Sequence, residues 1–579
     1  MSPQTTLGGV LVAPDQAVDA TLDRERPRSR LSINDWLRDH LSATVFAVLI
    51  AGFALRIYAA GRSYLNPDEA LHYLLVHQHS LLSAYYASLT NAHPPLIYVI
   101  LYFWQFLGRS ELMLRIPSVL AGIAFCWLLY KWVGLLFGRA ASLAALVLAA
   151  FSPALISLSA QVREYAFLLF GIGGALYSLE RALEARSARK MAYFTAFLYV
   201  AILSHYSAAF FTVAVGAYAL TRIVKAKRPW KVVATWIAGQ CGALAIYVFL
   251  YVTHVSRIET GEMDLWSSPH EESFFHFGHD SLLEFTVRQT SAIFRFLFEA
   301  DYLRQALLLL FVAAVGLLLA TRLLARNRAF HTWPMGLLLL LPFVAVWTAA
   351  LAGIYPYSGS RHTVLLAPFV FAGVGISLAK LFRRKLWAAP LIAALIAAAA
   401  YTSGLTFEPY ITRANQAKPL MAGAVEYVRQ TIPRSDHILV DMQSSALIAY
   451  YLCDPGDTIW IEPYQREFNP FLCNGYSVVA TNDRAWKFTP DNFASRFVAM
   501  ATASQLKPGD RVWVFQAGWG TNLDVNLPWF VKQYSCLTAK TFGSNITVIP
   551  FAVGADLFPD LPPGSPHLSQ LNRCVNDPT

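Results

Sequence analysis

The sequence predicts an α-helical polytopic membrane protein that ends in an extracytoplasmic α/β domain. The 579 residues are 56% hydrophobic and only 14% charged, with a mean hydropathy of +0.42. This is more apolar surface than one water-soluble core usually buries. The apolar residues gather in stretches of spanning or near-spanning length, and the pattern changes to short strands and helices after about residue 418.

The N-terminal segment, residues 1–41, is predicted to be a basic cytoplasmic tail. The chain has 46 basic and 36 acidic residues, a formal net charge of +10, and its positive residues lie in short runs between apolar segments. Such runs are typical of a topology signal, so we expect no nucleic-acid partner. No cleavable signal pattern precedes residues 44–60, which are therefore predicted to be an uncleaved anchor.

A transmembrane domain is predicted over residues 42–405, with eleven or twelve helices. Basic clusters at 181–190, 222–231, 322–328 and 380–385 mark cytoplasmic loops, and an even number of apolar stretches separates each from the next. The twelve stretches are 44–60, 95–108, 114–137, 141–157, 165–183, 191–203, 206–222, 231–253, 303–322, 333–353, 363–379 and 386–404.

Twelve full crossings would return the C-terminal part to the cytoplasm, against the charge pattern. We therefore predict that the shortest stretch, 95–108, is re-entrant or interfacial and that eleven stretches cross. The outer face then holds the loops 61–94 and 255–302 and everything after about residue 405.

Residues 406–579 are predicted to form a periplasmic α/β domain and tail. Strand-like HILVD, YSVVAT and RVWVF alternate with helix-like AGAVEYVRQT, SALIAYYL and NFASRFVAMAT. One or two disulfides would suit an oxidising compartment, with free packed thiols as the alternative. Four of the six cysteines lie here and allow three pairings: Cys453, Cys473, Cys536 and Cys574.

Two adjacent carboxylates, Asp68 and Glu69, follow the first crossing in the segment YLNPDEALHY, residues 64–73. Pro67 can start a helix, and acidic residues are favoured in a helix's first turn, which is the structural interpretation. The functional interpretation is a general base that accepts the proton of an attacking hydroxyl, with its neighbour holding an acceptor or a metal.

Three more motifs follow in order. They are HPPL from His93, SELMLRIPS at 110–118, and QVREY at 161–165, at the outer end of another crossing. Taken singly, a proline pair indicates a helix start, and a charge at a helix end is typical of a snorkelling side chain.

In this order the motifs resemble those of the GT-C fold glycosyltransferases that use polyprenyl-phosphate sugars. This group holds the protein O-mannosyltransferases and the lipid A aminoarabinose transferases. The resemblance spans about residues 60–225 and includes an FGR…A turn at Phe137–Ala140. It implies a hexosyl- or pentosyltransferase in the inner (plasma) membrane, acting with inversion at the periplasmic face. The implied partners are a polyprenyl-phosphate-linked sugar donor, a lipid, glycan or protein acceptor, and membrane lipids.

The resemblance also implies residue roles. Asp68 matches the catalytic first carboxylate, which would polarise the acceptor hydroxyl, and Glu69 would assist or orient. Arg163 would hold the leaving phosphate bidentately, with Glu164 and Tyr165 beside it in the substrate site.

Two further positions are implied to approach the substrate. His93 stands where the aminoarabinose group commonly has Lys, so it would donate or accept a hydrogen bond. Arg361 and His362 lie in a stretch that resembles the Arg-bearing segment near the donor phosphate. Their alternative role is an interfacial anchor beside Tyr355 and Tyr357.

The outer loop 255–302 is rich in His, Asp and Glu, so a divalent metal stays open, but it lacks the compact spacing typical of zinc. We predict no certain cofactor and interpret this loop as a mobile lid carrying Phe274, Phe275 and Phe277. His205 and Tyr206 would either line the cavity or be structural.

Two alternative functions are a flippase or transporter for lipid-linked saccharides and a polysaccharide polymerase or ligase. Transport predicts internal repeats with broken helices at mid-membrane. The ionisable residues of the predicted membrane domain instead collect at one face, which favours chemistry at a surface.

Overall fold

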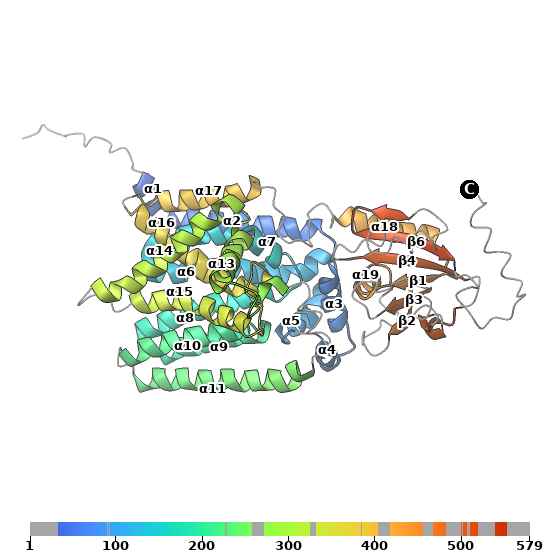
Figure 1. Ribbon diagram of the computed structural model, residues 1–579, viewed down its shortest axis with the longest axis horizontal. Coiled ribbons are helices and arrows are strands. Elements are labelled where there is room, and N and C mark those ends of the chain that lie inside the picture. The colour runs from blue at the N-terminus through green and yellow to red at the C-terminus, as the bar shows by residue number, and fades with distance from the viewer. Residues whose placement is uncertain are drawn as a thin grey trace, which may run out of the picture.

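The computed structural model describes residues 33–89, 91, 93–225, 229–257, 271–324, 332–383, 385–402, 417–454, 467–481, 499–500, 502–506, 510–518 and 539–552. They form a bundle of helices with an α/β domain at one end (Figure 1). The predicted combination of a helical membrane domain with a C-terminal α/β domain is confirmed.

Seven helices in the described part of the chain are long and apolar enough to cross a membrane. Apolar surface of this length is stable only where lipid or other helices cover it, so the chain is a multi-pass membrane protein. The candidate spans are α2 (Leu41–Arg62), α6 (Glu111–Ala150), α8 (Tyr165–Ala185), α11 (Trp230–Thr253), α14 (Arg304–Leu324, with η4, Asp301–Leu303), α15 (Thr332–Leu351) and α16 (Ala367–Leu381, with η5, Arg361–Leu366).

Shorter helices complete the bundle. They are α1 (Ile33–Asp39), α3 (Pro67–Val76), α4 (Leu81–Ser88), α5 (Leu96–Trp104), α7 (Pro153–Ser159), α9 (Ala188–Ser204), α10 (Ala208–Lys225), α13 (Leu282–Phe298) and α17 (Ala388–Thr402). Three short 3-10 helices lie between them: η1 (Gln105–Leu107) after α5, η2 (Val255–Arg257) after α11, and η3 (Glu271–Ser273) before α13. Together α5 and η1 cover Leu96–Leu107, which rises only about 18 to 20 Å, short of a bilayer core of about 30 Å. A non-spanning segment at 95–108, as predicted, fits this length.

Helix α6 lies at the centre of the bundle and packs against α2, α8, α16 and α17. It joins two predicted stretches, 114–137 and 141–157, but its backbone breaks at Gly138, where φ is +82°. A side chain at such a φ is strained, so glycine suits this position. The break confirms the predicted turn at Phe137–Ala140.

Arg56 departs from the expected collection of ionisable residues at a single face. Arg56 lies inside the span of α2, is fully buried, and donates to the carbonyl oxygens of Gly52 (3.0 Å), Ala149 (3.3 Å) and Ala150 (2.8 Å). Two of these are carbonyls at the C-terminal end of α6 that the helix itself leaves unpaired. Arg56 therefore joins α2 to α6.

The two predicted outer loops are partly helical. The segment 61–94 contains α3 and α4, and 255–302 contains the 17-residue helix α13. Phe275 donates its backbone N–H to Ala350 (3.4 Å) at the end of α15, and its ring packs on Phe285 with centroids 5.5 Å apart. The described part of the predicted lid is thus anchored to the bundle, and residues 258–270 lie outside the described residues.

The α/β domain is built on a six-stranded sheet of order β2-β3-β1-β4-β6-β5. Its central strand β1 pairs in parallel with β3 and β4, and the remaining pairs are antiparallel. Helix α18 packs on β5 and β6, and α19 packs on β1, β3 and β4. The elements are α18 (Lys418–Thr431), β1 (His437–Val440), α19 (Met442–Tyr451), β2 (Phe468–Cys473), β3 (Tyr476–Thr481), β4 (Arg511–Ala517), β5 (Lys540–Phe542) and β6 (Ile546–Ala552).

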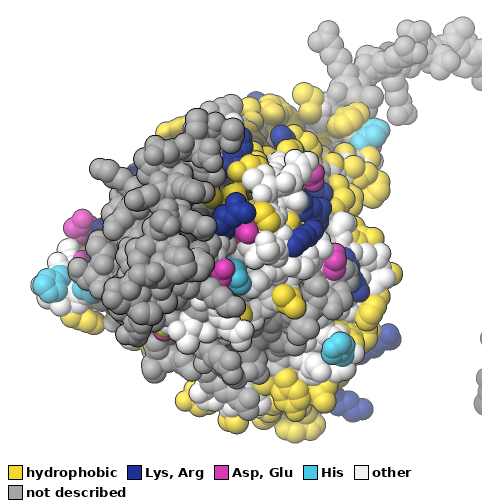
Figure 2. Space-filling model, turned by 90° about the vertical axis from the view of Figure 1, so that its right-hand side faces the viewer, with side chains coloured by type: hydrophobic (Ala, Val, Ile, Leu, Met, Phe, Trp, Pro, Cys, Tyr) yellow, Lys and Arg dark blue, Asp and Glu magenta, His cyan; other side chains and the backbone are white. Residues whose placement is uncertain are grey.

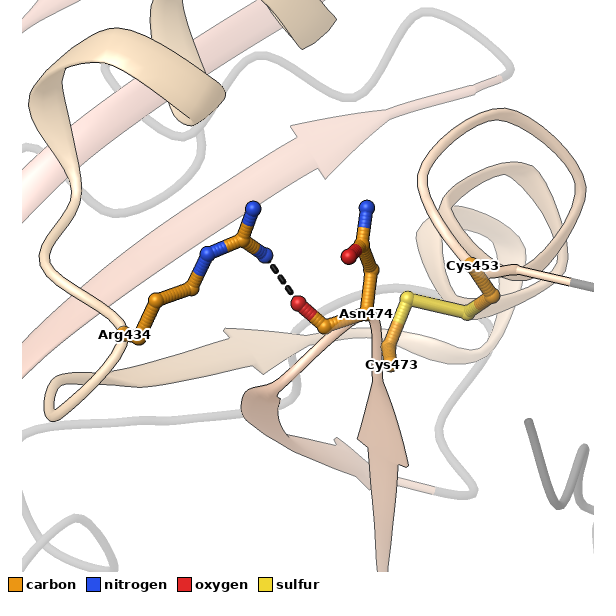
Figure 3. Close-up of a disulfide and its surroundings, with 4 residues drawn as sticks. All are labelled: Arg434, Cys453, Cys473 and Asn474. Atoms are coloured by element: carbon orange, nitrogen blue, oxygen red, sulfur yellow. Dashed lines mark hydrogen bonds between the residues drawn. A yellow bond between two sulfur atoms is a disulfide. The ribbon is translucent and has the colours of Figure 1, made fainter.

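A disulfide joins Cys453, just after α19, to Cys473 at the end of β2 (Figure 3). Next to it, Asn474 and Gly475 both have positive φ, as a two-residue hairpin turn between β2 and β3 requires. Arg434 donates to the Asn474 carbonyl beside this turn. The structure thus pairs two of the four cysteines with each other, while Cys536 and Cys574 lie outside the described residues.

The α/β domain is docked onto the helices that carry the candidate site. Helix α19 packs against α3, and the Tyr451 hydroxyl accepts the Leu65 N–H (2.7 Å) just before α3. Lys418 of α18 forms an ion pair with Glu111 (2.9 Å) at the start of α6. Seen from this end, charged side chains of both signs lie among hydrophobic ones on the described surface (Figure 2).

Candidate active site

The acidic pair lies in the first turn of α3. The side chain of Asn66 accepts the Glu69 N–H (3.0 Å), and the Glu69 carboxylate accepts the Asn66 N–H (2.9 Å), a reciprocal capping box. Pro67 occupies the first turn, where its missing N–H is not needed. The local sequence therefore starts the helix at this point and places Asp68 and Glu69 on different sides of it.

Both oxygen atoms of the Glu69 carboxylate accept hydrogen bonds. Arg115 of α6 donates to it twice, through Nε (2.8 Å) and Nη2 (2.7 Å), and the Val162 N–H donates a further bond (2.8 Å). Together with the Asn66 N–H this makes four hydrogen bonds, about the capacity of a carboxylate. Both side chains of the pair are 1% exposed. These contacts join α3 to α6 through Glu69, so of its two predicted roles, to assist or to orient, they favour the second.

Asp68 points the other way. Its side chain is 30% exposed, and its Oδ2 forms ion pairs with Arg163 and with Arg361, the latter at 3.4 Å. Burial raises the pKa of Asp68, but Arg163 and Arg361, helped by His72 and His93, outweigh burial and lower this pKa to about 2. The carboxylate is therefore ionised at neutral pH.

Arg163 is held from behind by a buried polar cluster. Glu164 Oε2 lies 3.5 Å from Arg163 Nε and 3.6 Å from His72 Nε2, and its Oε1 lies 3.5 Å from His93 Nδ1. Burial raises the pKa of Glu164, but Arg163, His93 and His72 hold it well below its usual value. Burial lowers the pKa of His93 to about 3, so this ring is neutral at pH 7 and acts as a hydrogen-bonding group.

His205 and Tyr165 border the same cluster. The His205 ring lies 5.4 Å from the Tyr165 ring and 6.0 Å from that of His93, and its Nδ1 hydrogen-bonds Ser207 (2.8 Å). Tyr165 accepts a bond from Arg163 Nη2 (3.4 Å). Of the two interpretations left open, the structure places His205 against the site.

His362 is buried, and its ring lies 6.4 Å from that of Tyr355, whose hydroxyl donates to the His362 carbonyl (2.9 Å). These contacts hold the turn that carries Arg361. Of the predicted site residues, Arg163 and Arg361 both contact the Asp68 carboxylate. Glu164, Tyr165 and His93 contact Arg163. Glu69 and His362 support this group from their own elements.

His72 and Arg115 were not predicted as site residues, although both lie in the quoted motifs. His72 follows Asp68 by four positions on α3 and hydrogen-bonds its carbonyl through Nδ1 (2.6 Å). That spacing puts both on one face of a helix, which is the signal that could have identified it. Arg115 carries no such local signal, since its partner Glu69 lies 46 residues away.

His72, His93 and Glu164 also form a possible ligand set for a metal, since their donor atoms all lie within 4.8 Å of one another. Two imidazoles and a carboxylate suit zinc-like ions. However, Arg163 already supplies a positive charge to Glu164 and approaches His93 Nε2 to 3.4 Å. Arg163 thus balances the negative charge of Glu164 without a metal ion. In the loop 255–302, the possible metal ligands Glu259, Glu262, Asp264 and His270 lie outside the described residues.

Comparisons with known proteins support this architecture. Residues 92–252 match the family model described as dolichyl-phosphate-mannose-protein mannosyltransferase. No curated protein sequence matches the chain.

Two crystal structures of ArnT from Cupriavidus metallidurans are similar to it. The one bound to undecaprenyl phosphate has 12% identity and a TM-score of 0.50, over 91% of this chain and 99% of that chain. The apo structure has 13% identity and a TM-score of 0.49, over 88% and 98%. The Archaeoglobus fulgidus oligosaccharyltransferase tethered to an acceptor peptide has 12% identity and a TM-score of 0.49, over 90% of this chain and 77% of that chain.

At these identities the likeness concerns the fold. It agrees with the family match, which covers the HPPL, SELMLRIPS and QVREY motifs. The predicted resemblance is confirmed: this chain is a multi-pass membrane protein with the fold of the GT-C glycosyltransferases.

Proposed function

We propose that this protein is a membrane glycosyltransferase that moves a sugar from a polyprenyl-phosphate donor to an acceptor hydroxyl, with inversion. Its site and its α/β domain would face the periplasm from the inner membrane, and its product would belong to a cell-envelope glycan, glycolipid or glycoprotein. The observation that carries the proposal is the partly exposed Asp68 carboxylate held between Arg163 and Arg361. The similar ArnT structure is described as bound to undecaprenyl phosphate, which supports the choice of donor.

The two arginines would bind the donor phosphate. A guanidinium can hold a phosphate through two parallel N–H bonds, and cations at a leaving group stabilise the charge that develops on it. Arg163 lies just before α8, and Arg361 starts η5, which leads into α16. A phosphate between them would be clamped from two sides.

Donor binding would also prepare the base. In the structure both arginines pair with Asp68 and lower its pKa to about 2, which makes it a weak base. A phosphate that recruits the same guanidinium groups removes much of this stabilisation. The pKa of Asp68 then rises toward the range in which a carboxylate accepts a proton more readily.

In the transfer step Asp68 would accept the proton of the acceptor hydroxyl as its oxygen attacks the anomeric carbon. The bond from that carbon to the phosphate oxygen breaks, and the electron pair leaves with the polyprenyl phosphate. Because Glu69 is buried and engaged by Arg115 and two backbone N–H groups, Asp68 is the partly exposed carboxylate of this pair, which favours one displacement with inversion.

Glu164, His93 and Tyr165 would act through Arg163 as positioning residues. Their contacts of 3.4 to 3.5 Å surround the guanidinium on its buried side. An arginine whose rotamer is already fixed loses less entropy when it binds phosphate.

The test is transfer from a panel of radiolabelled polyprenyl-phosphate sugars by purified protein in lipid. Asp68→Asn and Arg163→Ala should lose transfer, whereas Asp35→Asn, an exposed change at the other end of the bundle, should retain it. NMR of the product should show inversion at the anomeric carbon. Wild-type transfer by folded Asp68→Asn, or retained configuration, would overturn the mechanism.

A further inference from the structure

A basic cavity lies at the end of the bundle opposite the α/β domain. Its volume is about 430 Å³, and it opens between α1, the break in α6 and the end of α16. Figure 1 shows α1 and the nearby ends of α14 and α16 far from the sheet. Four cations line it: Arg38, Arg139, Lys380 and Arg383.

The backbone holds these cations in place. Arg139 directly follows the break at Gly138, and Lys380 lies in the last turn of α16. The Asn34 side chain accepts the Leu386 N–H (2.8 Å) and thereby fastens α1 to the segment after α16. The cavity is thus formed by three elements that are tied to one another.

The positive charge of the cavity is largely unbalanced. Arg38 pairs with Asp35 at 3.3 Å. Arg139, Lys380 and Arg383 form no ion pair with any described residue. Three like charges around one hollow repel one another, and an anion placed between them would relieve this repulsion.

The remaining walls are mostly apolar and include Phe137, Ile376 and Leu386. A small inorganic anion would leave such walls unused. An amphiphile, with an anionic head group and an apolar part, would contact both kinds of wall.

The position of the cavity along the bundle also fits a lipid head group. The span that starts at Arg361 in the candidate site ends at Leu381, next to the cavity, after 21 residues. This corresponds to about 32 Å of helix, close to the bilayer core of about 30 Å. The cavity and the candidate active site therefore lie at opposite membrane surfaces.

We propose that this cavity binds the phosphate group of an anionic phospholipid in the leaflet opposite the active site. Arg suits the phosphate oxygens through its paired N–H groups, and basic clusters at a membrane surface attract anionic lipids. A bound lipid would bridge α1, α6 and α16.

Native mass spectrometry of the full chain in micelles tests this with phosphatidylglycerol and phosphatidylcholine. Wild type should retain phosphatidylglycerol preferentially. The double variant Arg139→Gln/Lys380→Gln should bind it about 30-fold more weakly, since each cation contributes about fivefold at an anionic surface. The matched control is Arg186→Gln/Arg189→Gln, two exposed changes at the end of α8 and the start of α9, outside the cavity, which should bind as wild type does.

Equal phosphatidylglycerol binding by wild type and the cavity variant would overturn the proposal. Titration with inorganic phosphate separates the two sources of the anion. If phosphate alone displaces the lipid or binds as tightly, the cavity is an anion site and the lipid assignment is wrong. Lys380→Gln alone, with an expected loss of about fivefold, replaces the double variant if the latter fails to fold.

Discussion

The substitution Glu69→Gln distinguishes a scaffold role from a catalytic one. The Glu69–Arg115 pair is 1% exposed on both sides, so the variant would leave the Arg115 guanidinium buried without a countercharge. Breaking such a pair costs about 3 to 5 kcal/mol. Because whole domains are stable by only about 5 to 15 kcal/mol, we expect a large fall in the unfolding temperature and the loss of α3 from its place.

The assay is thermal unfolding of the purified protein, read alongside donor binding and transfer. The matched variant Glu69→Met/Arg115→Met removes both charges and should recover much of the lost stability, since apolar replacements of a buried pair are often tolerated. The coupling energy from this double-mutant cycle measures the pair. If Glu69→Gln unfolds as wild type does and yet abolishes transfer while still binding donor, Glu69 is catalytic and the reasoning is refuted.

Further outcomes follow from the site and the disulfide. Asp68→Asn removes a competitor for the two arginines, so donor binding, measured by titration, should tighten even as transfer falls; weaker binding would contradict this. Because its pKa is lowered to about 2, ionised Asp68 stabilises the fold fully above about pH 4, and this stabilisation is lost as the pH falls toward 2. The titration of Asp68 should therefore cause no change in melting temperature between pH 5 and 8. Cys453→Ala/Cys473→Ala opens a loop of 20 residues and should cost about 3 kcal/mol in denaturant unfolding; unchanged stability would contradict the pairing. Because Arg163 balances Glu164, EDTA should leave transfer unchanged, and restoration of lost transfer by zinc would assign a metal.

Much of the fold could be predicted because its signals are local. Membrane helices follow from runs of apolar residues, the break in α6 from one glycine, and the start of α3 from Asn66 and Pro67 next to two acids. The helix α13 inside a predicted loop was missed because its sequence is amphipathic rather than continuously apolar, so a search for spanning segments passes over it.

The candidate site was predicted in part. Asp68, Arg163 and Arg361 were each proposed from short motifs, and the structure brings them together. The contacts of Glu69 could not be predicted, because a motif gives two neighbouring carboxylates without saying which way each one points.

The sequence alone determined that this chain folds in a membrane, where most of its helices lie, and that α3 starts with acidic residues, since these features depend on residues close together in the chain. Only the tertiary structure decided that Arg115 pairs with Glu69 while Arg163 and Arg361 pair with Asp68. Adjacent residues on a helix point about 100° apart, so each carboxylate meets whatever distant segment packs on its own side. Which segment that is depends on the packing of whole helices, and no local pattern records it.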